Sequence, residues 1–325
     1  MLQPTSEFLS SRLRPWGLLT AAGAVGCAAT AMGLLGRFWW LLDLMAHFPV
    51  HYALGLVVLA IVLLWARRRA TAVVFLAFAG VNLAIVSPAY FGKQPAPPAA
   101  HLTLRAMLLN VNARQGDVAR VEQVVRQWNP DILVLEEVSS RWMPALARLA
   151  EAYPHTIIEP RGDNFGICLL SKLPVVKREV VHIGDADVPT ILATVDTGTA
   201  RLHIVATHPL PPIGREYSRW RNEQLEKLPH HIDASQPTLL LGDLNTTPWS
   251  HHFRQLIRES GLLDSSRGRG IQGSWPSFVP SPLRIPIDHV LHSPAVAVVS
   301  RSIGPSVNSD HRPVIVDFAV IEQRP

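Results

Sequence analysis

Oxygen-bearing side chains follow several apolar segments in the C-terminal two-thirds of this chain. Asn110, Glu137 and Asp243 each come at or just after the end of such a segment, and Asn245 lies two positions beyond Asp243. If the chain stays extended there, residues 243 and 245 point to the same side. Carboxylate and amide oxygens are the ligands that hard divalent cations prefer. The pattern therefore suits a site for such a cation and a phosphate ester.

Two histidines lie at comparable positions. His208 follows an apolar segment, where its imidazole could donate a hydrogen bond to a phosphate oxygen. His311 comes after Asp310 and just before another apolar segment, and Asp288 lies in a further one. An Asp that is hydrogen-bonded to one ring nitrogen fixes the tautomer of a histidine and stabilises its cation. One of the two Asp residues could therefore orient His311, while the other binds metal or water.

Each of these signals also has a simpler explanation. Asp and Asn favour turns, so Asp243 and Asn245 could merely close a strand. Glu136 and Glu137 could form a solvated strand end, although two adjacent acids after so apolar a segment favour a cation as partner. The chain has 14 histidines, so any single one, including His208, is weak support. Only the complete set of residues, and no single one of them, indicates a site for a cation and a phosphate ester.

The apolar segments that carry these residues predict buried strands. Early strands alternate with helices, and later strands follow one another directly. This order does not fit a parallel doubly wound sheet and favours an α/β fold of two packed sheets with helices outside. The expected strands cover residues 102–111, 132–135, 165–170, 175–182, 191–195, 202–207, 238–241, 287–291 and 314–318, and the expected helices residues 117–128, 142–153, 215–228 and 251–260.

The first 93 residues are more apolar than the rest. No Asp, Glu, Lys or Arg occurs in residues 16–36, 48–66 or 70–92. Because about 20 apolar residues cross a bilayer as a helix, these segments predict about three transmembrane helices. A Pro-rich stretch that follows predicts a stiff, extended linker. The predicted organisation is a membrane anchor in residues 1–93, a linker in residues 94–100 and a globular domain in residues 101–325.

The distribution of charge supports a membrane location and disfavours a nucleic-acid-binding domain. The formal net charge of +5 lies entirely in residues 1–93, so the remainder is formally neutral. It lacks the excess of basic residues that nucleic-acid-binding domains usually carry. Basic residues next to membrane segments prefer the cytoplasm. With three spans, Arg12, Arg14 and residues 67–69 lie on that side, which predicts a multi-pass protein of the cell membrane with its C-terminal domain outside the cytoplasm.

Taken together and in order, the polar residues resemble the motif series of the endonuclease/exonuclease/phosphatase superfamily, which includes deoxyribonuclease I. The resemblance covers about residues 101–320. It implies a four-layer α/β sandwich, in which two packed mixed sheets are flanked by helices, and hydrolysis of a phosphoester bond. The family usually has Gln before its metal-binding Glu, where this chain has Glu136. The residues that carry the resemblance are Asn110, Glu137, His208, Gly242, Asp243, Leu244, Asn245, Asp288, Ser309, Asp310 and His311.

The resemblance implies which residues hold the metal and act on the water. Glu137 would hold Mg²⁺ or Mn²⁺, with Asn110 and Asp310 nearby. Asp243 would orient or deprotonate the attacking water. Hydrolysis of a phosphoester needs both functions, because the phosphoryl group must be neutralised while a water molecule attacks in line with the leaving oxygen.

The same resemblance implies which residues bind the phosphate. Asn245 and His208 would contact the phosphate oxygens. His311, oriented by Asp288, would stabilise the charge that builds on those oxygens. Losing either member of such a His–Asp unit should cost roughly a hundredfold or more in rate, if the unit supplies one stabilising contact in the transition state.

These expectations favour a membrane-tethered, metal-dependent phosphodiesterase, nuclease or phosphatase. A lipid-headgroup phosphodiesterase of the sphingomyelinase type is an alternative, since a bilayer would be within reach. A catalytically silent binding module is another, but it has no chemical need for the complete set of acids and histidines. A structural or transport protein is disfavoured, because the uncharged segments offer no transport path. The expected partners are a phosphoester substrate and the bilayer, and the sequence indicates no protein partner.

Two further groups of residues have open interpretations. Arg215, Arg219 and Arg221 could contact an anionic substrate, but a solvated helix face shared with nearby glutamates is favoured. Trp275, between Ser274 and a proline, could line the site or pack beside a turn. Only two cysteines occur, which allows no disulfide framework or zinc-site spacing.

Overall fold

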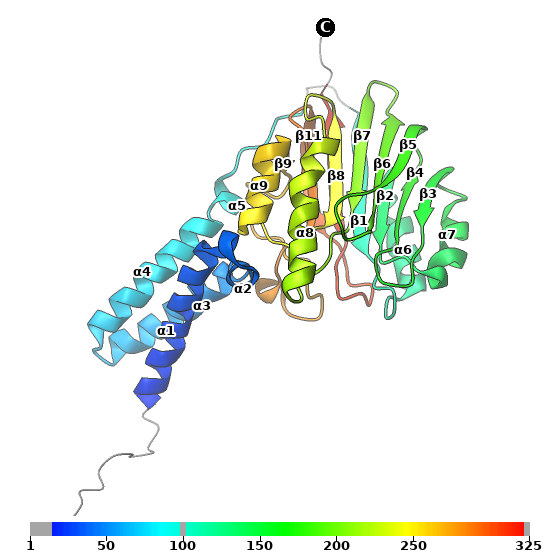
Figure 1. Ribbon diagram of the computed structural model, residues 1–325. Helices are drawn as coiled ribbons and strands as arrows, with labels where there is room; N and C mark the ends of the chain where they lie inside the picture. The colour runs from blue at the N-terminus through cyan, green and yellow to red at the C-terminus, as the bar shows by residue number, and fades with distance from the viewer. Residues whose placement is uncertain (1–14, 98–101, 322–325) are drawn as a thin grey trace, which may run out of the picture.

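The computed structural model describes residues 15–97 and 102–321, and two six-stranded sheets make up most of its C-terminal part (Figure 1). The strand order is β11-β12-β1-β2-β4-β3 in the first sheet and β5-β6-β7-β8-β10-β9 in the second. Only the β1–β2 and β7–β8 pairs are parallel among the described strands. The strands are β1 (Leu104–Asn110), β2 (Ile132–Glu136), β3 (His155–Glu159), β4 (Ile167–Ser171), β5 (Val175–His182), β6 (Pro189–Asp196), β7 (Arg201–Thr207), β8 (Thr238–Asp243), β9 (Leu263–Asp264), β10 (Asp288–His292), β11 (Val296–Ile303) and β12 (Val314–Val320).

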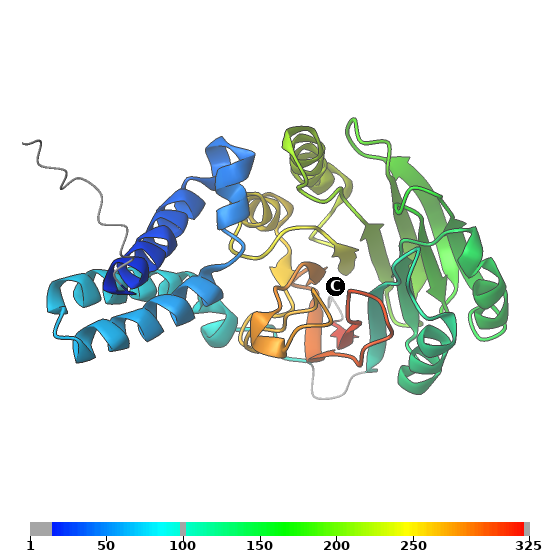
Figure 2. The same cartoon turned by 90° about the horizontal axis from the view of Figure 1, so that it is seen from below.

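Helices cover the outer faces of both sheets (Figures 1 and 2). The helices α6 (Val118–Trp128) and α7 (Met143–Leu149) pack on the first sheet, and α8 (Arg215–Lys227) and α9 (His251–Ser260) pack on the second. A third apolar core lies between the sheets. Strands that are buried on both faces read as continuous apolar segments, which is why the sequence revealed them. The four layers confirm the predicted α/β sandwich.

Several elements differ from the sequence-based expectation, among them the two-residue edge strand β9, which was not predicted. The edge strand β3 was not predicted, because only Ile157 among its residues is buried. The edge strand β11 was also missed, since a bulge between Val298 and Ser300 interrupts its pairing with β12. The helix α7 is shorter than expected. The chain turns after it so that Tyr153 is buried and donates a hydrogen bond to the carbonyl oxygen of Pro130 at 2.9 Å.

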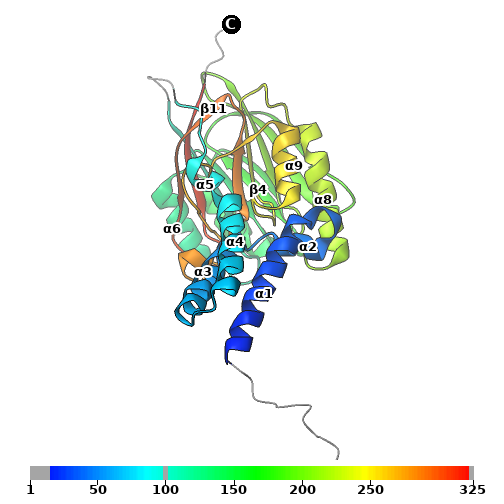
Figure 3. The same ribbon diagram turned by 90° about the vertical axis from the view of Figure 1, so that its left-hand side faces the viewer.

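The N-terminal helices form a bundle that projects from the sandwich (Figures 1 and 3). The helix α3 (Pro49–Trp65) packs against α4 (Arg69–Val86) and α1 (Pro15–Leu34), which also contact each other. Short elements at the end of the bundle nearest the sandwich join these helices to each other and to the rest of the chain. They are η1 (Gly36–Phe38), α2 (Trp40–Met45) and α5 (Pro88–Phe91).

Two of the three predicted spans are long and apolar enough to cross a membrane. They are α1 and the segment Arg69–Phe91, whereas α3 has only 17 residues. Just 17% and 28% of the residues in the apolar stretches of the two long helices are buried. Most of the apolar residues of these two helices are therefore not buried inside the described part of the protein. The expected number of three spans is not confirmed.

Candidate active site

The parallel pairing of β1 and β2 brings Asn110 and Glu137 together. Asn110 ends β1 in register with Glu136, which ends β2. Glu137 then takes a left-handed backbone conformation, with φ of 60°. Its Oε1 accepts a hydrogen bond from Nδ2 of Asn110 at 3.1 Å, and its Oε2 accepts one from the backbone N–H of Ala113 at 3.1 Å. Two of the predicted metal ligands are therefore adjacent.

Glu136 is completely buried and bonds to the second sheet. Its two carboxyl oxygens lie 3.1 and 3.0 Å from the backbone nitrogen of Asp243, which donates to them. Burial and the nearby carboxylates of Asp243 and Asp288 raise the pKa of Glu136 well above its usual value, which favours its neutral form. A neutral carboxylic acid has nearly the shape of the glutamine that the family pattern carries. Although Glu136 departs from that pattern, it still makes a contact between the two sheets.

Asp243 lies at the centre of the site. Its Oδ2 is 3.3 Å from Nδ2 of Asn110, 3.5 Å from Nε2 of His311 and 3.6 Å from Nε2 of His208. Its side chain is almost completely buried. Burial raises the pKa of Asp243 to about 8, although the nearby imidazolium of His311 acts in the opposite direction. Residues from both sheets thus converge on one carboxylate.

A tight turn after β8 sets the direction of these side chains. A Cβ on Gly242 would lie 2.0 Å from the carbonyl oxygen of Thr207, so only glycine fits between β7 and β8 here. Oδ1 of Asp243 accepts a hydrogen bond from the backbone N–H of Asn245 at 3.0 Å, and Asn245 has a φ of 49°. Asp243 therefore closes the strand β8, as the simpler expectation states, and it also belongs to the site.

Asp288 contacts the imidazole of His311. Asp288 begins β10 opposite Asp243 in the ladder, and its Oδ2 and Oδ1 lie 2.9 and 3.1 Å from Nδ1 of His311. The backbone N–H of His311 donates to Oγ of Ser309 at 3.0 Å. Burial alone lowers the pKa of His311, but Asp288 and Asp243 raise it to about 10. The imidazole is therefore cationic at neutral pH.

His208 and Asn245 form a neutral side of the site. Nδ2 of Asn245 lies 3.4 Å from Nε2 of His208 and donates to the carbonyl oxygen of Pro209 at 2.9 Å. The ring of His208 packs on Phe165, with 5.4 Å between centroids. Burial and the cationic His311 lower the pKa of His208 to about 3, so this imidazole is neutral. Its Nδ1 has no hydrogen-bond partner among the described residues.

Asp310 lies at the margin, and both its carboxylate oxygens already accept hydrogen bonds. Oδ1 accepts one from Nδ2 of Asn112 at 2.7 Å, and Oδ2 accepts one from Nε1 of Trp275 at 3.2 Å. Trp275 therefore contacts the site rather than only packing beside a turn. Sequence reasoning did not select Asn112, although its position two residues after Asn110 was a usable signal.

One expectation about the helix α8 is wrong. Arg215 and Arg219 are exposed, but Arg221 on the same helix is completely buried. The solvated face exists, since Arg219 lies 3.6 Å from Glu223 one helical turn later. Arg221 instead points inward and donates a hydrogen bond to Asp43, which lies 178 positions earlier in the chain. The spacing of residues along one helix gives no information about a partner so far away in the sequence.

The donor set fits a hard divalent cation. Carboxylate oxygens of Asp243 and Asp288 lie within 4.8 Å of each other, and Glu137 adds a partly exposed carboxylate beside Asn110. The cationic His311 is close to them but has no free lone pair for a metal. A nearby cation would favour the charged form of Asp243, whose pKa is raised by burial. Both oxygens of Asp288 already face Nδ1 of His311. Glu137, whose hydrogen-bond partners are amide groups, is the better ligand.

Comparison with known proteins identifies the family. The model of the Endonuclease/Exonuclease/phosphatase family matches residues 107–311, which is more than half of the chain and includes every predicted site residue. The chain belongs to the endonuclease/exonuclease/phosphatase family, a group of phosphoester hydrolases. No curated protein matches the chain significantly.

Solved structures share the fold of the sandwich. An endonuclease/exonuclease/phosphatase from Beutenbergia cavernae is 26% identical, with a TM-score of 0.56 over 67% of this chain and 72% of the other. A family protein from Bacteroides thetaiotaomicron is 18% identical, with a TM-score of 0.57 over 68% and 99% of the two chains. Sphingomyelinase C from Streptomyces griseocarneus is 18% identical, with a TM-score of 0.50 over 66% and 99%.

Proposed function

We propose that this protein is a membrane-tethered, divalent-metal-dependent hydrolase of phosphoester bonds that uses water as the nucleophile. The observation that carries the proposal is the convergence on Asp243. Its Oδ2 lies within 3.6 Å of Asn110, His208 and His311, which come from separate segments of the chain and from both sheets. Such an arrangement can activate water beside a phosphoryl group and stabilise the charge that develops there.

The proposed reaction joins the oxygen of a water molecule to phosphorus while the ester P–O bond breaks. Asp243 accepts the proton of the attacking water, and burial brings its pKa to about 8, in the range useful for a base. The imidazolium of His311, held by Asp288, donates to a phosphoryl oxygen. His208 and Asn245 bind a second oxygen. The leaving oxygen takes up a proton from solvent.

Glu137 and Asn110 are the proposed holders of Mg²⁺ or Mn²⁺, with Asp310 contributing from the margin. A divalent cation bound there supplies positive charge for the phosphoryl and leaving oxygens. Asp310 has the weaker support, because its carboxylate is hydrogen-bonded to Asn112 and Trp275 at the margin of the site and not to Asn110. Asn110 has the stronger support from its position, because its Nδ2 donates to both Glu137 and Asp243 and so places its amide beside the two carboxylates.

The proposed organisation is a membrane anchor in residues 1–93, a linker in residues 94–100 and a catalytic domain in residues 101–325. Exposed apolar side chains on α1, α3 and α4 support it, including Val25, Val58 and Val73. The turn with Arg67, Arg68 and Arg69 lies at the end of the bundle away from the sandwich (Figure 1). With α3 as a third span, this arrangement supports a non-cytoplasmic catalytic domain. A C-terminal alkaline phosphatase fusion tests it, and an inactive fusion contradicts it.

A lipid headgroup is the second candidate substrate, and a specific surface favours it. The loop between Trp275 and Arg284 exposes Phe278 (80%) and Leu283 (49%) beside the site. The carbonyl oxygen of Leu283 lies 3.2 Å from Nε2 of His51 at the start of α3. This loop is therefore next to the end of the bundle, where a membrane surface would be. Exposed apolar side chains at that position suit contact with lipid.

The test uses the full-length protein in detergent with bis-p-nitrophenyl phosphate. We expect hydrolysis that requires Mg²⁺ or Mn²⁺ and is abolished by Glu137→Ala and by His311→Ala. Equal rates for wild type and both variants with either ion would favour a catalytically silent binding module. A panel of sphingomyelin, inositol phosphates, single-stranded DNA and duplex DNA with an abasic site then separates the substrate classes.

A further inference from the structure

A buried ion pair joins the N-terminal helices to the sandwich. Nη2 of Arg221 on α8 donates to Oδ2 of Asp43 on α2 at 2.6 Å, and the two side chains are 0% and 1% exposed. Figures 1 and 3 show α2 against the lower part of α8. A buried charge is tolerated only when it is paired and hydrogen-bonded, so each residue needs the other.

The same carboxylate holds the segment that leads to α9. Oδ1 of Asp43 accepts a hydrogen bond from Oγ of Ser250 at 2.7 Å. One turn further along the N-terminal segment, Nδ1 of His47 lies 3.0 Å from Oγ1 of Thr247. All these side chains are buried. Residues between the first and the second apolar helix thus make three contacts with the loop and helix that frame the active site.

Arg221 extends this network to a residue of the proposed site. Its Nη1 donates to the carbonyl oxygen of Asn245 at 3.0 Å. Asn245 is held in a left-handed conformation, which a non-glycine residue adopts only when its surroundings support it. The side chain of Asn245 in turn reaches Pro209 and His208. One guanidinium group therefore connects Asp43 to the backbone that aims Asn245.

We propose that Asp43 and Arg221 are positioning residues, through which the N-terminal helices hold Asn245 in its phosphate-binding orientation. The anchor is then part of the active enzyme and not only a tether. This inference rests on the proposed function of the site. Because the planar fork of arginine can bind Asp43 and Asn245 at once, lysine cannot replace it.

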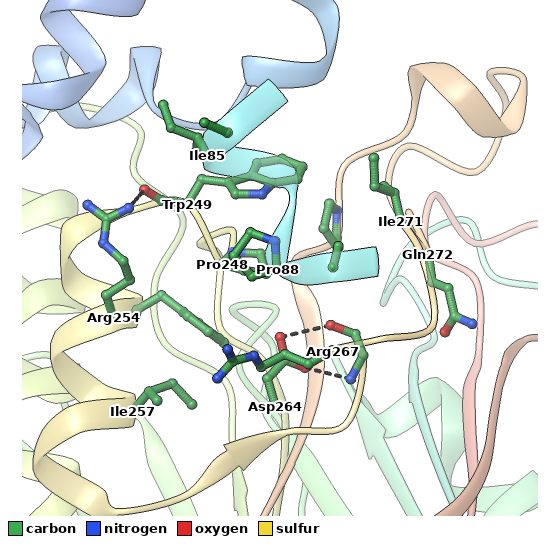
Figure 4. Close-up of a pocket in the computed structure, with 16 residues that line it drawn as sticks. Ile85, Pro88, Pro248, Trp249, Arg254, Ile257, Asp264, Arg267, Ile271 and Gln272 are labelled. Atoms are coloured by element: carbon green, nitrogen blue, oxygen red, sulfur yellow. Dashed lines mark hydrogen bonds between the residues drawn. The ribbon is translucent and has the colours of Figure 1, made fainter. Parts of the chain in front are cut away.

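A second set of contacts at the same junction provides a matched control. Nε2 of Gln94 donates to the carbonyl oxygens of Asp264 and Arg267 at 2.7 and 3.1 Å, and its Oε1 lies 3.0 Å from Nε2 of His292. Beside this contact, a cavity of about 440 Å³ separates α4 and α5 from α9 (Figure 4). None of these contacts or lining residues belongs to the proposed site. Loss of Gln94 should therefore weaken the junction without moving Asn245.

The first experiment compares Asp43→Asn, Arg221→Lys and Gln94→Ala in the full-length protein in detergent. Hydrogen–deuterium exchange of residues 243–250 reports on the loop whether or not the protein is active. We expect faster exchange there in the first two variants and wild-type exchange in Gln94→Ala. Unchanged exchange in Arg221→Lys, which keeps the buried positive charge, would overturn the proposal even if Asp43→Asn folds poorly.

The second experiment is a double-mutant cycle on diester hydrolysis with Asn245→Ala. We expect Arg221→Lys to lower kcat by about 10- to 100-fold, because small misplacements of a positioned group have effects of this order. In the Asn245→Ala background the same change should have almost no further effect. Equal losses in both backgrounds would show that Arg221 acts elsewhere. An inactive wild type would reject the proposed function, while the exchange result would still decide the positioning role.

Discussion

Nδ1 of His311 lies 2.9 Å from Oδ2 of Asp288, although the two residues belong to different segments on either side of β11. The carboxylate fixes the ring so that Nε2 points toward Asp243, at 3.5 Å. It also favours the imidazolium form, because Asp288 has the largest effect among the carboxylates that raise the pKa of His311 to about 10. A group held in this way can donate a hydrogen bond to a phosphoryl oxygen throughout the neutral pH range.

We expect Asp288→Asn to lower kcat on a generic diester by roughly a hundredfold or more, because the imidazolium loses both its orientation and its charge. Steady-state kinetics measures this change. Asp317→Asn is a control, since Asp317 pairs with Arg105 on the opposite end of the sandwich at 2.6 Å. A loss in the control as large as in Asp288→Asn would point to a general effect on folding.

The pH dependence of kcat/KM should be bell-shaped. With the cation bound, activity should rise as Asp243 loses its proton, at a pH below the value of about 8 that its pKa has without a cation, since positive charge favours the carboxylate. It should fall as His311 loses its proton near pH 10. Asp288→Asn should move the alkaline limb to lower pH. An alkaline limb at the same pH in wild type and variant would contradict the assignment of His311.

Glu136→Gln should keep its activity and change the pH dependence of stability. The pKa of Glu136 is raised in the folded state by burial, so its contribution to the free energy of unfolding is complete below its ordinary pKa and is lost as the pH rises through the folded pKa. Glutamine does not titrate, so the variant should lose less stability toward alkaline pH. Denaturant unfolding at several pH values measures this, and identical pH profiles for the two proteins would refute it.

Glu137→Ala should weaken binding of Mn²⁺ and Mg²⁺ by at least about tenfold, because a carboxylate is the strongest oxygen ligand for these ions. Isothermal titration calorimetry measures the affinity without any substrate. Glu151→Ala changes an exposed acid and serves as the control. Asp310→Asn should have a smaller effect than Glu137→Ala, since Asp310 lies at the margin of the site, hydrogen-bonded to Asn112 and Trp275. The reverse order would move the metal to the Asp310 side of the site.

Phe278→Ser should lower hydrolysis of sphingomyelin in vesicles while leaving hydrolysis of the soluble diester unchanged. Phe278 is 80% exposed on the loop that contacts the start of α3, so its removal takes away apolar surface only where a bilayer would lie. Val176→Ser, which changes a 51% exposed residue on β5, is the control. Equal loss on both substrates would assign Phe278 a role inside the site instead.

The strands and most site residues could be predicted because the relevant signals are local. Central strands are buried on both faces and read as apolar segments, and a polar residue at the end of such a segment is conspicuous, as with Asn110 and Asp243. Although the edge strand β5 was predicted, the edge strands β3, β9 and β11 lack this signal and were missed. Their residues pair with only one neighbour and are partly exposed.

The contacts that could not be predicted join residues far apart in the chain. Arg221 looked like part of a solvated face because its partner Asp43 lies in the N-terminal region. The choice between Asp288 and Asp310 as the partner of His311 also required the structure, since both are plausible from sequence. The β8–β10 ladder decides it by placing Asp288 opposite Asp243.

The central claim is that residues from both sheets form one metal-dependent hydrolytic site around Asp243. The most direct measurement is the rate of diester hydrolysis by full-length wild type and Asp243→Asn, each with Mn²⁺ and with a chelator. We predict hydrolysis by wild type only with the ion, and a rate at least about a hundredfold lower for the folded variant with the ion. If wild type with the chelator and Asp243→Asn with Mn²⁺ both hydrolysed the diester as fast as wild type with Mn²⁺, the account would be contradicted.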